Sequence, residues 1–343
     1  MIGNNAIKDF IIRNIRSRPS DVVRFAANYF GISVQAINKH VKDLIAKDIL
    51  IAIGNTKSRK YELVTKTSEY FYDITGLLGE DAVLRNDIHK YFENLPDNVK
   101  KIWNYSFTEM FNNAIDHSDG KKINVIIKQD ILDTVIIIQD DGVGIFKKIG
   151  DFLKISDARE VVAELAKGKF TTDPERHSGE GIFFTSRMVD AFFIHSYNVS
   201  WGHRRDKADW IFDENEKDEL KGTSVFLRVS NNSDVIVKDV FDKYGNPDFN
   251  STVIPVILMD STGEGLVSRS QAKRLLNRLE KFNIVYMDFS GIKSVGQAFA
   301  DEIFRVYKLS NPGVQIIEKN AEEEVQNMIK RARNNTLAIV TEE

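Results

Sequence analysis

The stretch from residue 107 to residue 117 contains the residue types that bind a cation or a charged ligand. At about 100° per residue, its polar side chains fall in one narrow stripe of a helix, opposite its large apolar side chains. The polar stripe consists of Glu109, Asn112, Asn113 and Asp116. The apolar side consists of Trp103, Phe107, Met110, Phe111, Ala114 and Ile115. The stripe contains no Lys or Arg, so unless its oxygens are simply solvated we expect them to meet a cation or a ligand donor, such as a magnesium–nucleotide complex.

Two glycine-containing segments further along the chain have the chemistry of a nucleotide pocket. Asp140 follows an expected strand at 134–138 and presents a fixed carboxylate to a donor such as an exocyclic amine. Gly142 and Gly144 come next and permit left-handed turns and a close backbone approach. The polar, aperiodic segment 167–178 has the composition of a mobile loop. It ends in Gly179-Glu180-Gly181, which opens a helix whose free backbone amides favour phosphate oxygens.

These segments occur in an order that resembles one ATPase superfamily. Four sequence boxes follow one another in the order found in gyrases, heat-shock chaperones, histidine kinases and MutL, which form the GHKL superfamily with its Bergerat fold. The boxes are Glu109 with Asn113, then Asp140-X-Gly-X-Gly, then Gly179-X-Gly, then Lys221-Gly222-Thr223-Ser224. The resemblance covers roughly residues 80 to 230. One Gly-X-Gly before a helix is a weak signal, but four boxes in order predict nucleotide binding.

The resemblance implies a role for each matching residue, with ATP and Mg²⁺ as cofactors. Asn113 would ligate Mg²⁺, and Glu109 would orient or deprotonate the attacking water. Asp140 would hold the adenine amine, and Thr223 would support the adenine side. The remaining implied ATP contacts are Gly142 and Gly144 in the pocket, Lys169 in a lid formed by residues 168–178, and Gly179, Glu180 and Gly181 around the phosphates. The roles of Asn112 and Asp116 stay open.

The chain departs from the sensor kinases of this superfamily in two ways. Ile182-Phe183-Phe184 stands where many of them have Leu-Gly-Leu. A paired-helix dimerisation domain with a phosphoacceptor histidine is not recognisable either. His89 lacks the acidic and arginine neighbours of such a histidine, so we interpret it as structural and do not expect histidine autophosphorylation.

The first 66 residues differ from the rest in charge. They contain 12 Lys and Arg against 5 Asp and Glu, a net charge of +7, whereas the chain as a whole has −3 and the remainder therefore −10. Helices are expected at 7–16, at 22–30 with Gly31 closing the helix in a tight turn, and after Ser33 as the N-cap of the third helix. Strands are expected at 49–53 and 61–64. This pattern resembles a winged helix-turn-helix domain, and a basic head on an acidic body suggests an anionic partner such as DNA.

In that family the third helix enters the major groove and the wing contacts the DNA backbone. Gln35 and Asn38 would then read base edges. The residues expected to meet phosphates are Lys39, Lys42, Lys57, Arg59 and Lys60. The alternative is that the winged helix is a protein-docking module, and the charge excess favours DNA.

The pattern resets at Thr252. Strands expected at 253–259, 284–289 and 314–318 alternate with helices at 268–281, 297–309 and 321–333, and residues 337–340 are expected to close the sheet. Residues 288–299 resemble the strand-turn-helix of the STAS fold of anti-sigma-factor antagonists, in the version of an uncharacterised STAS-like domain fused to such ATPases. Ala298 stands at the position of the antagonists' phosphorylated serine, and Ser294 is better explained as a turn or cap residue. We therefore expect a docking or homodimerisation surface for an unidentified protein partner.

The predicted fold class is an α/β (α+β) multidomain protein. Its expected parts are a winged helix (1–66), a connector and leading helix (67–98), a Bergerat-type α/β sandwich ATPase (99–232), a linker (233–250) and a small STAS-like α/β sandwich (251–343). Within 67–98, the connector is expected at 70–78 and the helix at 80–95. The absence of Cys excludes disulfide scaffolds and thiolate zinc sites. No signal pattern and no apolar run of about 20 residues is present, so we expect a cytoplasmic protein with no membrane contact.

The leading functional hypothesis is a regulator in which ATP and Mg²⁺ binding, with slow hydrolysis, switches a DNA-binding head and a STAS-like tail. The sequence does not separate a role in transcription regulation from one in phage defence. A first alternative is a protein serine/threonine kinase of the anti-sigma-factor type acting on a partner protein. A second alternative is a nucleotide-binding scaffold without turnover.

Overall fold

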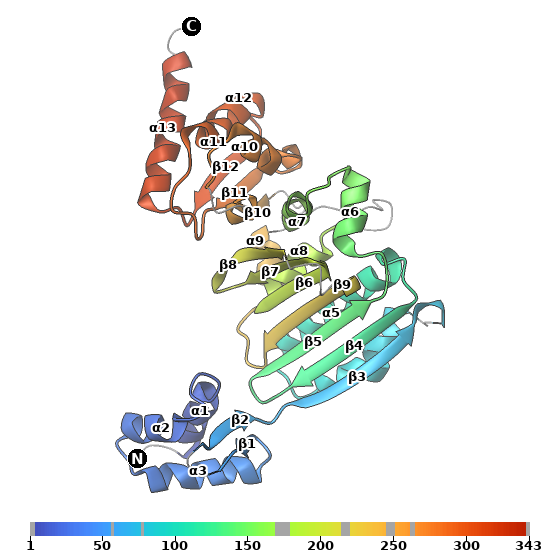
Figure 1. The fold of residues 1–343 in the computed structure, drawn as a ribbon, viewed down its shortest axis with the longest axis vertical. Helices are drawn as coiled ribbons and strands as arrows, with labels where there is room; N and C mark the ends of the chain where they lie inside the picture. Colours follow the sequence, from blue (N-terminus) through green and yellow to red (C-terminus); the bar gives the residue numbers. More distant parts are fainter. Residues whose placement is uncertain are drawn as a thin grey trace.

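The structure analysed is a computed structural model, and it describes residues 4–55, 58–76, 79–168, 179–213, 220–244, 251–260 and 265–340. Within these ranges the chain is a mixed α/β protein with a two-stranded, a seven-stranded and a three-stranded sheet (Figure 1). The three sheets follow one another along the chain, which defines an N-terminal, a central and a C-terminal unit.

The N-terminal unit contains three helices and a hairpin. Its elements are α1 (Asn4–Asn14), α2 (Val22–Phe30), α3 (Val34–Ala46), β1 (Leu50–Ile53) and β2 (Lys60–Leu63), with β1 and β2 antiparallel. Gly31, at a φ of 65°, ends α2, and the Ser33 hydroxyl accepts a hydrogen bond from the Ala36 N–H at 3.2 Å. This confirms the turn and the cap predicted from the sequence. The helices bury a separate apolar core that includes Ile11, Ile37 and Val41.

The N-terminal unit contacts the central sheet through Arg16. Its guanidinium pairs with Asp130 at 2.6 Å and also with Asp133, both at the turn between β4 and β5. Helix α3 lies on the side of the unit that faces away from the central sheet (Figure 1). The helix expected to read DNA is therefore not covered by the central unit.

The central unit is one antiparallel sheet in the order β3-β4-β5-β9-β6-β7-β8. Its strands are β3 (Lys66–Asp73), β4 (Lys122–Gln129), β5 (Asp133–Asp140), β6 (Ala191–Tyr197), β7 (Val199–Arg204), β8 (Lys207–Asp213) and β9 (Leu220–Ser230). Its helices are α4 (Glu80–Val83), α5 (Asp97–His117), α6 (Ile145–Leu153), α7 (Ala158–Ala166), α8 (Gly181–Met188) and α9 (Val237–Tyr244). Helices α5 and α8 pack on one face of the sheet, and α5 runs behind β4, β5 and β9 in Figure 1.

Two segments before α5 differ from the prediction. The sequence suggested a connector at 70–78, but residues up to Asp73 belong to β3, which pairs with β4 along its whole length. Tyr70 and Tyr72 pack against the core, and only their tertiary partners reveal the strand. The continuous helix expected at 80–95 is instead α4, a π-helical turn at Leu84–Ile88 and a 3₁₀ turn at His89–Tyr91.

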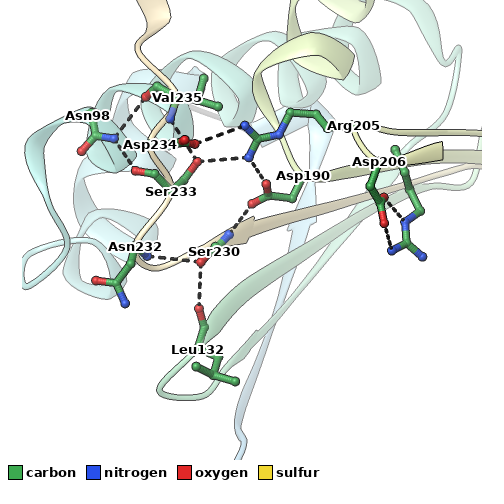
Figure 2. Close-up of polar contacts among 11 residues, drawn as sticks. Asn98, Leu132, Asp190, Arg205, Asp206, Ser230, Asn232, Ser233, Asp234 and Val235 are labelled. Carbon is green, nitrogen blue, oxygen red and sulfur yellow. Dashed lines mark hydrogen bonds and ion pairs between the residues drawn. The ribbon is translucent and has the colours of Figure 1, made fainter. Parts of the chain in front are cut away.

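A polar network connects the β7–β8 turn, the segment after β9 and the start of α5 (Figure 2). Arg205, in the turn between β7 and β8, pairs with Asp190 and with Asp234 at 3.5 Å. Asp190 also accepts a hydrogen bond from the Ser230 N–H at 2.6 Å. Asn98, at the start of α5, donates to the Ser233 and Val235 carbonyls. The segment that leads into α9 is thereby held against both α5 and the β7–β8 turn.

The C-terminal unit is a three-stranded parallel sheet with helices around it. Its elements are β10 (Ser251–Pro255), α10 (Arg269–Leu276), β11 (Ile284–Asp288), α11 (Gln297–Asp301), α12 (Lys308–Ser310), β12 (Gln315–Lys319) and α13 (Glu323–Val340), with 3₁₀ turns at Val256–Met259 and Leu279–Lys281. A π-helical segment, Glu302–Tyr307, joins α11 to α12, so helical structure covers the predicted 297–309.

The prediction that residues 337–340 close this sheet is wrong, because α13 continues to Val340. Four apolar residues fit a helix or a strand equally well. The residues before them, Asn334-Asn335-Thr336, are a turn-type cluster, but they include neither Gly nor Pro and the helix continues through them. Local continuity therefore prevails over strand propensity at this end of the chain.

Candidate functional site

Asp140 lies at the end of β5, where its carboxylate accepts hydrogen bonds from backbone N–H groups. Its Oδ1 accepts hydrogen bonds from the Gly142 N–H at 3.0 Å and the Thr223 N–H at 3.1 Å. Burial raises the pKa of Asp140, and the bonds from Gly142 and Thr223 act against that rise. The Thr223 hydroxyl accepts a bond from the Ile145 N–H at 3.0 Å. The structure thus brings Asp140 and Thr223, 83 residues apart in sequence, into direct contact.

The adjacent Asp141 has a different role. Its Oδ1 accepts hydrogen bonds from the backbone N–H groups of Lys121 at 2.7 Å and Lys122 at 2.9 Å. The bond from Lys122 is the main cause that lowers the pKa of Asp141. Asp141 therefore fixes the start of β4, whereas Asp140 belongs to the candidate site.

Gly142 makes the close approach that the sequence predicted for a glycine. A Cβ there would collide with the carbonyl of Ser118, which follows α5. The Ser118 carbonyl also accepts a bond from the Val143 N–H at 2.8 Å. The loop after β5 is therefore packed on the C-terminal end of α5. Gly144, at a φ of 82°, precedes α6.

Helix α5 has the two faces that its sequence predicts. Phe107, Met110 and Phe111 are buried, whereas Glu109 and Asn113 are half-buried. Asn112 is half-buried and Asp116 is exposed.

Helix α8 begins directly at Glu109. A Cβ on Gly181 would collide with the Glu109 carboxylate, so a larger residue there would displace that side chain from its present position. Tyr105 lies one turn before Glu109 on α5, and burial together with the charges of Glu109 and Glu180 raises the pKa of its phenol. The N-terminus of α8, at Gly181, therefore lies beside Glu109 and Glu180. A carboxylate is electrostatically favoured at a helix N-terminus.

The predicted residues therefore form two groups at different positions along α5. Asp140, Gly142 and Thr223 lie near its C-terminal end, and Glu180 and Gly181 lie beside Glu109. From Glu109 to Ser118 the helix rises about 14 Å at about 1.5 Å per residue, and Asn113 lies between them. Gly179 has a φ of 72° just before α8. Lys169 and the predicted lid beyond Gly168 lie outside the described residues.

Sequence reasoning did not single out three residues of this site. Ser118 contacts Gly142, Tyr105 lies beside the two carboxylates, and the Ser196 hydroxyl donates to the Gly222 carbonyl at 2.7 Å. Tyr105 was detectable in principle, because it stands four residues before Glu109. Ser118 and Ser196 carry no such local signal.

The predicted DNA contacts lie on the surface of the N-terminal unit. Lys39 and Lys42 on α3 are exposed, and so is Gln35 in its first turn, whereas Asn38 is half-buried. Arg59 and Lys60 are exposed at the hairpin, and Lys57 lies outside the described residues.

Comparison with known families identifies one part of the chain. Residues 271–326 match the family model of a STAS-like domain of unknown function (DUF4325). This match runs from α10 into α13 and confirms that the C-terminal unit is STAS-like. No curated protein matches the chain. In the ranges that the structure describes, no helix is both long enough and apolar enough to span a bilayer.

Proposed function

We propose that this protein is an ATP- and Mg²⁺-dependent regulator in which a central GHKL-type domain of Bergerat fold binds ATP and slowly hydrolyses it. ATP binding switches the arrangement of an N-terminal winged-helix DNA-binding head and the C-terminal STAS-like unit. One observation carries the proposal: residues from four separated sequence boxes meet along a single helix, α5, with Asp140 and Thr223 near its end and Gly181 at Glu109.

The residues present fit a magnesium–nucleotide complex. Asp140 offers a half-buried acceptor for the adenine amine, oriented by two backbone N–H groups. Gly142 and Gly181 let the loop after β5 pack against Ser118 and the start of α8 pack against Glu109. The start of α8 supplies N–H donors suited to phosphate. Asn113 would hold Mg²⁺, which usually takes one or two protein ligands and supplies charge neutralisation to the phosphates. Glu109 would orient the attacking water or accept its proton.

The switching part of the proposal is supported by the contact between α7 and the C-terminal unit. Lys167 follows α7 and directly precedes the predicted lid segment. Its ammonium donates to the Asn277 carbonyl at 2.8 Å, and its own carbonyl accepts a bond from the Thr252 hydroxyl at 2.5 Å. A rearrangement of this segment on ATP binding would move those contacts, so nucleotide can bias how the STAS-like unit docks.

ATP binding and turnover are tested separately. Calorimetry with a non-hydrolysable ATP analogue and Mg²⁺ should show binding to the wild type and none to Asn113→Ala. Phosphate release should be measurable in the wild type and absent in Glu109→Ala. Glu93→Ala, at an exposed position outside the site, is the control and should match the wild type. Unchanged affinity in Asn113→Ala would contradict the assigned site.

Labelled ATP distinguishes this proposal from its alternatives. Release of labelled phosphate without labelled protein supports the ATPase switch. Transfer of label to a partner protein supports a serine/threonine kinase instead. Binding without either product supports a scaffold without turnover.

A further inference from the structure

A cavity of about 900 Å³ lies where the central and C-terminal units meet. We call it the junction cavity. Its walls come from the β7–β8 hairpin, from residues 234–244 including α9, and from the C-terminal sheet. None of its lining residues belongs to the proposed ATP site.

The wall from the C-terminal unit is the carboxyl edge of the parallel sheet. Pro255 and Asp288 end neighbouring strands in register, and Asn320 follows the third strand. The loops after the three strands lie together at this edge, so their polar groups share one wall of the cavity. Asp288 Oδ1 accepts bonds from the Ser290 hydroxyl at 2.6 Å and the Asn320 amide at 2.9 Å. The Asp288 carboxylate is thereby oriented as an acceptor for ligand hydroxyl groups.

Many of the charges on the opposite wall are already paired. Arg204 pairs with Asp206, and Arg205 pairs with Asp190 and Asp234 (Figure 2). Lys207 and Lys243 are exposed and form no ion pair among the residues that the structure describes, and Asp239 is a lining carboxylate of the same kind. Two ammonium groups and the Asp288 cluster therefore line the same cavity.

The cavity is also lined by a buried polar chain. Arg187 is 8% exposed and lies 2.7 Å from His203 Nδ1, which lies 2.5 Å from Asp209 Oδ1. Burial and the neighbouring Arg187 lower the pKa of His203. Arg187 Nε is buried and has no hydrogen-bond partner within the described part of the chain. A buried donor without a partner is costly, and a polar ligand or water in the cavity would relieve that cost.

Arg187 also connects the cavity to the ATP site. It stands near the C-terminal end of α8, whose first residue, Gly181, packs against Glu109. A ligand that displaces Arg187 would shift the helix that touches the hydrolytic carboxylate.

We propose that the junction cavity binds a small phosphorylated sugar, free or as part of a nucleotide, with its phosphate at Lys207 and Lys243 and its hydroxyl groups at Asp288. Bound there, it bridges the two units and changes the rate of ATP turnover through α8. The binding stands independently of the proposed function, and the effect on turnover rests on it.

Calorimetry with ribose 5-phosphate as the probe tests the binding. The full chain is first saturated with Mg²⁺ and a non-hydrolysable ATP analogue, so that the ATP site is filled. We expect saturable one-site binding, with ribose and inorganic phosphate at least tenfold weaker. Saturable binding of AMP at the same site identifies a nucleotide as the source, and its absence identifies the free sugar phosphate. No saturable binding of either compound overturns the proposal.

Substitutions locate the bound probe. Lys207→Glu and Lys243→Glu should each weaken ribose 5-phosphate at least tenfold, whereas Lys238→Glu, on α9 but outside the lining, should not. Asp288→Asn should remove the preference for ribose 5-phosphate over inorganic phosphate. Equal affinities in Lys243→Glu and Lys238→Glu would overturn the location.

The two proposals fail in different ways. Asn113→Ala should no longer bind the ATP analogue but should still bind ribose 5-phosphate. Lys243→Glu should still bind the ATP analogue but should bind ribose 5-phosphate more weakly. If the wild type does not bind the ATP analogue, a titration with ribose 5-phosphate alone still tests whether the junction cavity binds a sugar phosphate. Ribose 5-phosphate should change phosphate release at least twofold in the wild type and not in Lys243→Glu. Binding without that change overturns the regulatory effect.

Discussion

The Lys167 ammonium donates a hydrogen bond to the Asn277 carbonyl across the boundary between the central and C-terminal units, at 2.8 Å. Lys167 is 2% exposed and pairs with Glu164 at 2.5 Å, and Glu164 also meets Arg278 at 3.5 Å. Arg274 pairs with Glu160 at 2.7 Å on the same side of α7. Burial lowers the pKa of Lys167, and the charge and hydrogen bond of Glu164 act against that decrease. The contact is therefore a buried, partnered charge that joins α7 to the STAS-like unit.

Lys167→Met should destabilise the protein by about 3–5 kcal/mol, because it leaves the buried Glu164 carboxylate without its nearest partner. Urea unfolding measures the change. Lys147→Met removes an exposed pair with Asp151 and should leave the stability nearly unchanged. If Lys167→Met lowers the free energy of unfolding as little as Lys147→Met does, the Lys167 pair is not structurally important.

Asp140→Asn should bind ATP at least about tenfold more weakly, because it replaces a charged acceptor with a neutral one. The same variant should be more stable than the wild type at pH 7. Burial raises the pKa of Asp140 in the folded protein, so this group binds more protons in the folded state. The contribution of Asp140 to stability therefore falls as pH rises from its unfolded pKa of about 3.9 through the raised folded value.

The stability difference between Asp140→Asn and the wild type should therefore shrink towards zero near pH 3, where both states are protonated. Thermal unfolding at pH 3 and pH 7 measures it. A variant that is less stable than the wild type at pH 7 would argue against burial as the main influence on Asp140.

Gly181→Ala should reduce phosphate release at least tenfold, because the added methyl group must displace the Glu109 carboxylate from the start of α8. The matched control is Gly313→Ala, where an added Cβ meets nothing within 4 Å. Steady-state phosphate release measures both variants. Equal rates would mean that the position of Glu109 beside α8 is unimportant for turnover.

Lys39→Glu combined with Lys42→Glu should abolish DNA retention and its dependence on salt, because both residues lie exposed on α3. Lys47→Glu combined with Lys66→Glu makes the same change of net charge at exposed positions outside the predicted contacts. Filter binding at several salt concentrations compares them. If the two double variants retain DNA equally, net charge and not α3 determines binding.

Local patterns in the sequence were sufficient for most elements near the candidate site. The faces of α5, the Ser33 cap and the strand that ends at Asp140 all depend on residues within one or two turns of each other. Strand β3 was missed because its evidence is the pairing with β4, whose residues lie 49 to 63 positions further along the chain. The helical end of α13 was missed because a short apolar run does not distinguish helix from strand.

By itself, the sequence determined the residue types of the candidate site and the amphipathic helix that orders them, because helical spacing is a local property. Only the tertiary structure placed Thr223 against Asp140, Gly181 against Glu109 and Lys167 against Asn277. Each of these contacts joins residues at least 70 positions apart. Such contacts arise when sheet pairing and core burial bring distant elements together, and no periodicity along the chain encodes them.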